Sequence, residues 1–402
     1  MPANIGSDGG ISEDGIARIT QFDADRLQQH KLQVGDVVFS RRGDVTRNAL
    51  IEAHQAGWLC GTGCLKVRLG SQTQASAKFI SYCLRLPETK DWLVRHAVGA
   101  TMPNLNTSIL SAVPILLPEL PVQQSIANIL GCLDERIDLL RETNATLEAI
   151  VQALFKSWFV DFDPVHARAR GEQPAGLAPE VAALFPDSFE ESALGMIPRG
   201  WRVLSFTETI DVIGGGTPKT SISEYWNGDI PWFSVVDAPA TTDVFVIETE
   251  KHITCEGLNK SSTKLLPVGT TIISARGTVG RLALVGQAMA MNQSCYGLSG
   301  KAGDVYFTYF STHRLVETLK QRTHGSVFDT ITRDTLAGVS VVYPQTIVIT
   351  AFEETIAPVM ERIKENLIQA RTLATLRDTL LPRLISGQLR LPEAEAMVEG
   401  AS

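Results

Sequence analysis

The chain has 402 residues, of which 44% are hydrophobic and 20% charged, with a formal net charge of −8. This length exceeds one ordinary domain, and the composition is typical of two or three globular domains rather than of a disordered chain or a small disulfide-stapled protein. The six cysteines lack disulfide-framework and zinc-ligand spacing, no apolar run could cross a membrane, and no export signal is visible. We therefore expect a cytoplasmic protein.

The negative charge is concentrated in two segments. Residues 160–200 carry seven acidic and three basic side chains, and residues 391–402 carry three acidic side chains and no basic one. Residues 41–95, in contrast, hold nine bases and four acids. Net charge therefore does not exclude a nucleic-acid partner, although a solvated surface with scattered Lys and Arg is the simpler explanation of the charge alone.

The first predicted strands are short apolar runs at residues 37–40 and 65–69, bounded by Gly, Asn and Asp. The first run lies in residues 34–51, which align without gaps on residues 268–285 with nine of eighteen positions identical. Residues 110–118 and 135–137 also resemble the residues that lie 226 positions later in the chain. The chain therefore contains two copies of one unit.

A long amphipathic helix is predicted to close the first copy. Apolar residues across positions 126–158 recur at alternating spacings of four and three, which is typical of a coiled-coil seam. The predicted seam positions are Ile126, Leu130, Leu133, Ile137, Leu140, Asn144, Leu147, Val151, Leu154 and Trp158. At about 1.5 Å per residue this helix would be roughly 50 Å long, which suits two DNA half-sites about one helical turn apart.

Residues 160–200 are rich in Pro and Gly and are predicted to form a connector with one short helix near residues 180–185. Asp161 and Asp163 have the spacing of a metal-ligand pair. Because no third ligand lies nearby in the sequence, we interpret them as the end of the long helix and expect no metal site in this chain.

The second copy repeats this pattern, with predicted strands at residues 271–274 and 282–285 and a second long helix. Its predicted seam is weaker at Arg377, and Pro358 is expected to interrupt or kink it. Acidic residues 391–402 are predicted to be a flexible tail. The seam positions are Phe352, Ile356, Val359, Ile363, Asn366, Ala370, Leu373, Arg377, Leu380 and Leu384.

We predict that the two long helices pack antiparallel. Reflecting Asn144 through the midpoint of its stripe gives the position equivalent to Asn366, so the two amides would face each other and fix the register. A position for both at the wet edge of the seam stays open. The expected fold is α/β: two repeated β-rich domains (residues 1–118 and 201–345), joined by two long antiparallel coiled-coil helices (119–159 and 346–390) with pseudo-twofold symmetry.

Four repeated arginines are candidate ligand contacts. Arg42 and Arg276, and likewise Arg47 and Arg281, occupy equivalent positions near the ends of the predicted strands. Each could pair with a carboxylate or contact a DNA phosphate or guanine. Positions that differ between the copies would distinguish two half-sites, so we add Arg41 and Asn48 as candidate base contacts, together with Asn292 and Gln293, which could instead brace a loop.

A glycine-rich segment begins at Gly214 in the second copy. It lacks the spacing of a nucleotide-binding loop, so we expect a structural turn or a contact to DNA phosphate. Tyr225 and Trp226 beside it are more simply interpreted as loop anchors. The candidate DNA contacts from this region are Thr217, Lys219, Thr220, Ser221 and Tyr225.

In both copies, ordered motifs resemble the specificity subunits of type I restriction-modification systems. The resemblance spans nearly the whole chain. The first copy contributes Pro2-Ala3-Asn4-Ile5, residues 35–43, Gly61-Thr62-Gly63-Cys64 and Pro121-Val122-Gln123-Gln124, and the second contributes Gly215-Gly216-Thr217-Pro218, Ile230-Pro231-Trp232, residues 276–280 and Asn292-Gln293.

This resemblance implies a non-catalytic subunit with two target-recognition domains, each reading one half of a bipartite, asymmetric DNA site. It also implies that the long helices set the spacer and dock two modification subunits. S-adenosylmethionine, ATP and Mg would bind to those partners and to restriction subunits, and none to this chain. A coiled-coil scaffold that assembles proteins without binding DNA is the alternative.

One departure from the repeat concerns residues 201–234, which have no counterpart in the first copy. A late start, a truncation or a minimal first domain would each explain the difference. A missing strand would expose a sheet edge and apolar surface in the first domain.

Overall fold

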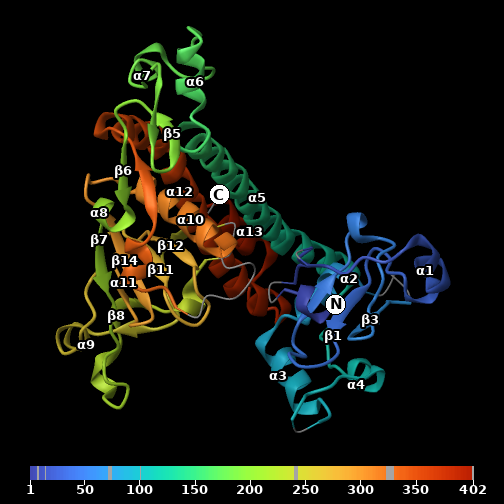
Figure 1. Cartoon of the computed structure of the whole chain (residues 1–402). Coiled ribbons are helices and arrows are strands. Elements are labelled where there is room, and N and C mark those ends of the chain that lie inside the picture. Colours follow the sequence, from blue (N-terminus) through green and yellow to red (C-terminus); the bar gives the residue numbers. More distant parts are fainter. Residues whose placement is uncertain are drawn as a thin grey trace. The chain divides into compact units, whose positions relative to one another are not determined.

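The computed structural model describes residues 1–6, 9–13, 15–70, 75–99, 101–239, 243–322 and 330–400. They belong to two compact units: unit 1 comprises residues 1–138 and 370–402, and unit 2 comprises residues 139–369. Two long helices, α5 (Leu120–Phe159) and α12 (Thr346–Ile385), contribute to both units (Figure 1). Among the described residues, no helix combines the length and the apolar character needed to cross a bilayer.

Unit 1 contains a three-stranded antiparallel sheet with the strand order β2-β1-β3. Helix α2 links this sheet to α5, because Tyr82 on α2 donates a hydrogen bond to Asp134 at 2.7 Å. The elements are α1 (Gln21–Arg26), β1 (Val37–Ser40), β2 (Asn48–Leu50), β3 (Cys64–Val67), α2 (Ala77–Cys83), α3 (Pro87–His96), α4 (Thr107–Ser111) and α13 (Leu391–Glu399).

Unit 2 is built on a five-stranded sheet with the order β7-β14-β11-β12-β9, beside a small sheet β10-β8-β13 and the pairs β15-β6 and β4-β5. Its strands are β4 (Phe189–Ser192), β5 (Gly195–Pro198), β6 (Arg202–Ser205), β7 (Ile210–Gly214), β8 (Trp226–Phe233), β9 (Phe245–Val246), β10 (His252–Ile253), β11 (Thr271–Ser274), β12 (Leu282–Val285), β13 (Ala290–Met291), β14 (Cys295–Gly300) and β15 (Ser340–Tyr343). Its helices are α6 (Asp163–Ala169), α7 (Pro179–Ala182), α8 (Phe206–Thr209), α9 (Cys255–Asn259), α10 (Tyr306–Arg322) and α11 (Arg333–Ala337).

The duplication seen in the sequence is present in the hydrogen-bonded strands. Val37 on β1 faces Leu50 on β2, and the residues 234 positions later, Thr271 and Leu284, face each other in unit 2. Ser40 faces Cys64 on β3, just as Ser274 faces Cys295 on β14. Strands β1, β2 and β3 therefore correspond in register to β11, β12 and β14, which confirms the predicted repeat.

The turn after β1 and the equivalent turn after β11 both require glycine. Gly43 has a φ of 80° and Gly277 a φ of 77°, in the left-handed region that side chains with a Cβ rarely adopt. In both copies this turn presents the residue before the glycine, which is Arg42 or Arg276. The repeated Arg-Gly pair thus encodes a backbone geometry as well as a charge.

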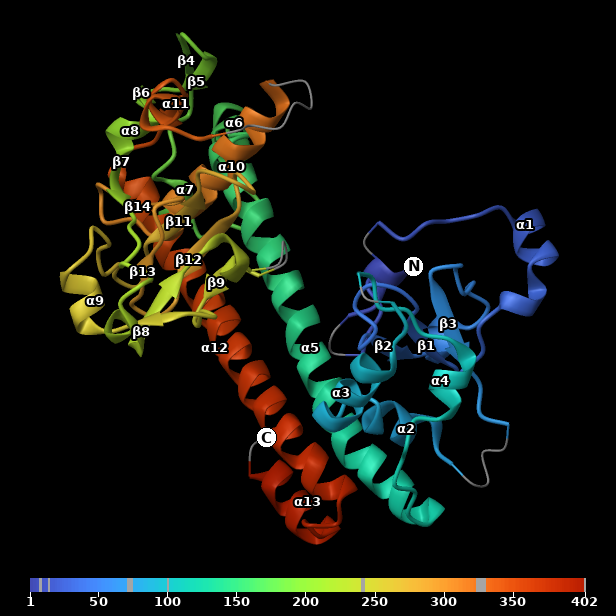
Figure 2. The ribbon, with the colours of Figure 1, turned by 90° about the horizontal axis from the view of Figure 1, so that it is seen from below.

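The long helices pack antiparallel, as predicted. In unit 2, the Nδ2 of Asn366 donates to the Oδ1 of Asn144 at 2.9 Å, and in unit 1, Arg377 lies 2.6 Å from Asp134. Asn366, the earlier of the two α12 residues, contacts the later α5 residue, and Arg377 contacts the earlier one, so the helices run in opposite directions. Figure 2 shows the two helices side by side. The predicted seam positions are buried, except for Leu147, Leu154, Val359 and Arg377, which are half-buried.

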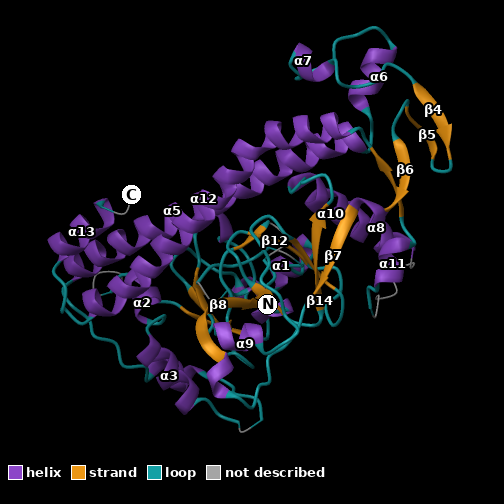
Figure 3. Ribbon diagram, turned by 90° about the vertical axis from the view of Figure 1, so that its left-hand side faces the viewer, coloured by secondary structure: helices purple, strands orange, loops and turns teal. Residues whose placement is uncertain are grey.

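Three predictions about the helices and their surroundings are wrong. Helix α12 runs without a break through Pro358, so this proline does not interrupt it. Residues 391–399 form helix α13 rather than a flexible tail, with Pro at its first turn and Ala394 fully buried. The connector holds α6, α7 and the β4–β5 hairpin (Figure 3), and its Val165 and Phe185 are part of the aromatic core around Trp158.

Candidate nucleic-acid interface

One end of the large sheet in unit 2 gathers most of the predicted contact residues. Strand β7 ends at Gly214, which faces Tyr296 near the start of β14, and β11 ends at Ser274, which faces Cys295. The loops that follow β7 and β11 and the loop that precedes β14 therefore meet at this end. Backbone bonds join them: the Gly216 N–H donates to the Met291 carbonyl at 3.0 Å and the Ala275 N–H to the Ser294 carbonyl at 2.7 Å.

The glycine-rich loop is fixed against its neighbours. A Cβ on Gly215 would lie 1.9 Å from the Asn292 carbonyl oxygen, and one on Gly216 would lie 2.3 Å from the Ser262 Oγ. The indole of Trp232 donates to the Gly216 carbonyl at 3.0 Å. Because the Gly216 N–H already has a backbone acceptor, it is not available to a phosphate. Lys219, Thr220 and Ser221, which follow, are exposed.

Of the four repeated arginines, Arg42 and Arg276 are the two that are open to solvent. Both side chains are exposed, and within the described ranges neither guanidinium has a hydrogen bond or an ion pair. Their backbones form equivalent bridges, Arg42 with Asn104 and Arg276 with Thr330. The two copies thus present a cation at the same place on the same turn.

Arg47 and Arg281 have structural partners instead. Arg47 lies 2.9 Å from Asp44. Burial would raise the pKa of Asp44, but hydrogen bonds from Thr46 and Arg47 outweigh it and hold that pKa below its usual value. Arg281 donates to the carbonyl of Ala238 at 3.2 Å and to that of Pro239. These contacts support the carboxylate or bracing alternative over a direct DNA contact.

Asn48 and Arg41 do not form an open reading surface. Asn48 is only 3% exposed and donates to the Thr46 carbonyl at 3.2 Å, so the proposal of a base contact is wrong for this residue. Arg41 is half-buried, and its Nε is enclosed without an acceptor among the described residues. A strand position adjacent to a turn can point into the domain as easily as outward, and the sequence did not distinguish these cases.

The amides of the loop before β14 have different roles. Asn292 is half-buried and its Oδ1 accepts the Ser294 N–H at 3.0 Å, so it braces the loop. Gln293 is exposed, and its Oε1 accepts a hydrogen bond from the Thr217 hydroxyl of the glycine-rich loop. Tyr225 is half-buried, and its backbone carbonyl accepts the Thr254 N–H at 3.0 Å.

Sequence reasoning missed the counterpart of Gln293 in unit 1. The Arg41 N–H donates to the Gly63 carbonyl at 2.9 Å, which matches the bond from Ala275 to Ser294. Thr62, which is exposed, therefore occupies the position of Gln293. The offset between the copies changes from 234 to 231 in this loop, and the cysteine shared by Thr62-Gly63-Cys64 and Gln293-Ser294-Cys295 was the available signal.

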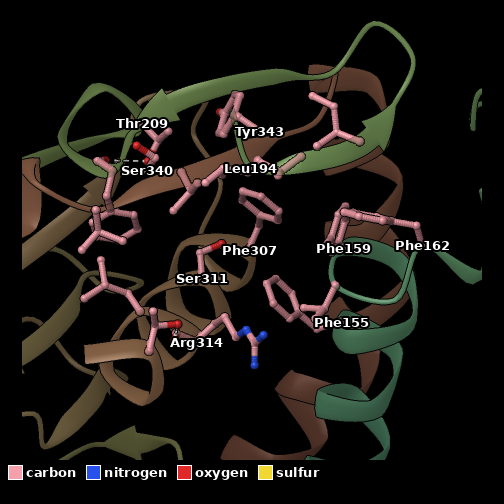
Figure 4. Close-up of a pocket in the computed structure, with 18 of the residues that line it drawn as sticks. Phe155, Phe159, Phe162, Leu194, Thr209, Phe307, Ser311, Arg314, Ser340 and Tyr343 are labelled. Atoms are coloured by element: carbon pink, nitrogen blue, oxygen red, sulfur yellow. Dashed lines mark hydrogen bonds between the residues drawn. The ribbon is translucent and has the colours of Figure 1, made fainter. Parts of the chain in front are cut away.

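A pocket of about 370 Å³ lies elsewhere in unit 2. Phe155 and Phe159 from α5, Phe307 and Arg314 from α10 and Tyr343 from β15 line it (Figure 4). It contains none of the predicted contact residues, and its aromatic wall continues the core around Trp158. Among the described residues, no group of three His, Cys, Asp or Glu side chains is placed to hold a metal ion.

Comparisons with known proteins agree on one family. The model of the type I restriction modification DNA specificity domain matches residues 8–149 and 198–376. The HindI specificity subunit of Haemophilus influenzae is 27% identical over 356 residues, which cover 78% of this chain and 77% of that subunit. The MjaIX specificity subunit of Methanocaldococcus jannaschii is 33% identical over 159 residues, or 39% of this chain and 37% of that subunit.

One solved structure has a similar fold. It is the S subunit of a type I restriction-modification system from M. genitalium, with a TM-score of 0.51 and 16% sequence identity. The match covers 87% of this chain and 82% of that subunit. At this identity the likeness concerns the fold alone.

Proposed function

The chain belongs to the family of type I restriction-modification DNA specificity domains, and from this membership we propose that it is the DNA sequence-specificity subunit of a type I restriction-modification complex. Each unit contributes one recognition domain that reads one half of a bipartite, asymmetric site. The observation that carries the proposal is the repeated turn that presents Arg42 and Arg276, both exposed, at the same end of equivalent sheets.

In this proposal the two arginines contact the DNA backbone or guanine. An unpaired guanidinium beside a sheet end can bind phosphate, or the O6 and N7 of guanine, with two parallel hydrogen bonds. Because the arginines are shared by both copies, they position each unit on the duplex without distinguishing the two half-sites. Discrimination requires side chains that differ between the units.

Thr62 and Gln293 meet that requirement. They occupy equivalent loop positions next to the arginine turns, both are exposed, and they offer different groups to a base edge. A glutamine amide can bond adenine at N6 and N7, whereas a threonine hydroxyl donates or accepts one bond. The bond from Thr217 orients the Gln293 amide, since its Oε1 is the acceptor and its Nε2 then points elsewhere.

The remaining parts of the proposal concern partners and location. The long helices would dock two modification subunits and set the spacer between the half-sites, and restriction subunits would join the larger complex. S-adenosylmethionine, ATP and Mg would bind to those partners, so this chain would itself be non-catalytic. A cytoplasmic location fits a protein that binds genomic DNA.

Retention of DNA at increasing salt tests the proposal. We expect the chain with its modification subunits to retain a reproducible subset of sheared genomic fragments at salt concentrations that release the bulk. Arg42→Ala and Arg276→Ala should each weaken retention by about 1–3 kcal/mol if they bind guanine, or lower the salt slope by about 1 if they bind phosphate.

The matched control is Arg170→Ala, because Arg170 is exposed but pairs with Glu172 at 2.7 Å. This variant should retain DNA like the unmodified chain. If the complex retained no fragment selectively, the protein would be a coiled-coil scaffold rather than a DNA-reading subunit. Equal retention by all three arginine variants would contradict the DNA contacts proposed for Arg42 and Arg276.

A further inference from the structure

The outer edge of β3 in unit 1 has no strand partner among the described residues, whereas its counterpart in unit 2 is paired on both sides. Strand β14 lies between β11 and β7, with Tyr296, Gly297 and Leu298 facing Gly214, Ile213 and Val212. Strand β3 pairs with β1 alone. In an antiparallel strand, alternate residues turn their N–H and C=O groups to opposite sides, so the edge of β3 presents a row of such groups.

Side-chain exposure agrees with this difference. All four residues of β3 are half-exposed. At the equivalent positions of β14, Cys295 is 1% exposed and Leu298 is fully buried. The apolar Val67, counterpart of Leu298, therefore lacks the cover that its equivalent has in unit 2.

A second segment of unit 1, just before α1, is also more exposed than its counterpart in unit 2. Thr20 caps α1 through a bond from the Asp23 N–H, just as Thr254, 234 positions later, caps α9 through a bond from the Gly257 N–H. This match makes Ile19 the counterpart of Ile253. Ile253 is fully buried against Trp232 and Trp226 of β8, whereas Ile19 is 51% exposed.

We propose that unit 1 carries a docking site for an extended apolar polypeptide segment with the chemistry of β7 and β8, going beyond the proposed reading of DNA. The first strand of this segment adds antiparallel to β3, so that Leu65, Lys66 and Val67 face residues equivalent to Gly214, Ile213 and Val212. The second strand, equivalent to β8, covers Ile19. The occupant is defined by unit 2, where the corresponding edge and the corresponding isoleucine are both filled by residues 210–233.

A second copy of this chain is a poorer occupant of the edge. Pairing β3 with β3 would bring two Lys66 side chains, or Lys66 and Arg68, to facing positions, and like charges opposite each other destabilise a sheet. Strand β7 carries no basic residue, and its sequence Ile-Asp-Val-Ile-Gly alternates in a way that suits a half-buried edge. The site therefore favours a separate segment of this kind.

The probe is a synthetic peptide with the sequence of residues 201–234, added to the full-length chain without DNA. We expect saturable binding of one peptide per chain by fluorescence anisotropy, together with slower hydrogen exchange of amides in residues 64–68. A peptide with Val212→Pro and Ile213→Pro should not bind, because proline removes the ladder donors.

Two chain variants identify the site. Ile19→Asp replaces an exposed side chain and should weaken binding about tenfold, which corresponds to about 1.4 kcal/mol. Val268→Asp, at a position that is 54% exposed in unit 2, should leave binding unchanged. Since the assay contains no DNA, its result is independent of the proposed function.

Three results would overturn the proposal. The first is no binding of the peptide. The second is binding that Ile19→Asp leaves intact, with protection at β14 instead of β3, which would mean exchange with the native segment of unit 2. The third is a dimer of the chain in which the amides of β3 are already protected without peptide.

Discussion

Asn144 and Asn366 form a polar contact between the long helices inside unit 2. Both are nearly fully buried, at 3% and 2% exposed. Asn366 donates to Asn144, and the Nδ2 of Asn144 donates to the Ile363 carbonyl at 3.0 Å. A buried amide is costly unless it is hydrogen-bonded, so only a register that brings the two together satisfies both. The pair thus specifies the register predicted from the sequence.

We expect Asn366→Leu to lower the free energy of unfolding by about 1–3 kcal/mol, because it leaves the Asn144 Oδ1 buried without a donor. Adding Asn144→Leu should recover much of that loss, since both polar partners are then replaced. Urea denaturation of the two single variants and the double variant measures the coupling. Strictly additive effects would show that the amides do not interact.

Glu148 is a second buried polar side chain of α5. It is 5% exposed, and burial, with a smaller contribution from Asp243, raises its pKa to about 7 from an ordinary 4.5. The neighbouring Asp243 also has a raised pKa, again mainly through burial. In the folded protein Glu148 therefore stays protonated at pH values between 4.5 and about 7, at which the same side chain of the unfolded protein is ionised.

This difference predicts how stability depends on pH. Between pH 4.5 and about 7 the unfolded state binds fewer protons at Glu148, so the free energy of unfolding should fall as pH rises, by on the order of 2–3 kcal/mol. Glu148→Gln should flatten that part of the profile and stabilise the protein above pH 7. Denaturation midpoints across this window provide the measurement. An unchanged slope in the variant would place the titration at another group, such as Glu353, whose pKa is also raised to about 7.

At the scale of elements, the contact between α5 and α12 differs in chemistry between the two units. In unit 1, Asp134 lies 2.6 Å from Arg377 and 3.1 Å from Arg85. The repeat places Met360 and Val151 at the equivalent positions in unit 2, and both are buried at 1% exposure or less. Arg377 is the charged residue that weakens the predicted apolar seam of α12. In the structure it belongs, with Asp134 and Arg85, to an ionic contact that stands where unit 2 has an apolar one.

Removing the shared carboxylate should destabilise this ionic contact. Asp134→Ala removes the acceptor that Arg85 and Arg377 share, although Arg377, which is 15% exposed, keeps its contact with Asp378 at 2.8 Å. We expect a loss of about 2–4 kcal/mol in the free energy of unfolding, because the Arg85 guanidinium and the Tyr82 hydroxyl both lose their carboxylate acceptor.

Glu365→Ala is the control, because Glu365 pairs with Arg362 at 3.5 Å on the exposed side of α12, where such pairs contribute below about 1 kcal/mol. Equal effects of the two substitutions in a denaturant titration would refute a structural role for the ionic contact.

For the whole molecule, the patterns that repeat were the ones that sequence reasoning could predict. The gap-free match around Arg42 and Arg276 predicted the equivalent strands and the shared turn, whose register the structure then supplied. The spacing of apolar residues predicted the long helices, and the positions of Asn144 and Asn366 predicted that they pack antiparallel. The tail was misjudged because its acidic composition was given more weight than its helix-forming residues, one of which, Ala394, is buried in the structure.

The candidate site was predicted less completely, because its geometry depends on residues distant in sequence. Arg281 is engaged by carbonyls more than forty positions away, and Asn48 by the Leu84 carbonyl at 3.5 Å. No local sequence pattern shows that these side chains already donate hydrogen bonds to distant backbone carbonyls. The equivalence of Thr62 and Gln293 in the two copies was likewise hidden by the three-residue change in offset. It became evident only from the equivalent backbone hydrogen bonds of the two loops.

In the proposed function, each unit reads its own short DNA sequence. Selection from a randomised duplex library by the chain with its modification subunits tests it most directly, with Thr62→Ala and Gln293→Ala compared against the unmodified chain. We predict two short sequence blocks separated by a fixed spacer, with each substitution relaxing preference in one block and leaving the other unchanged. A single contiguous block, or a change in both blocks caused by either substitution alone, would contradict it.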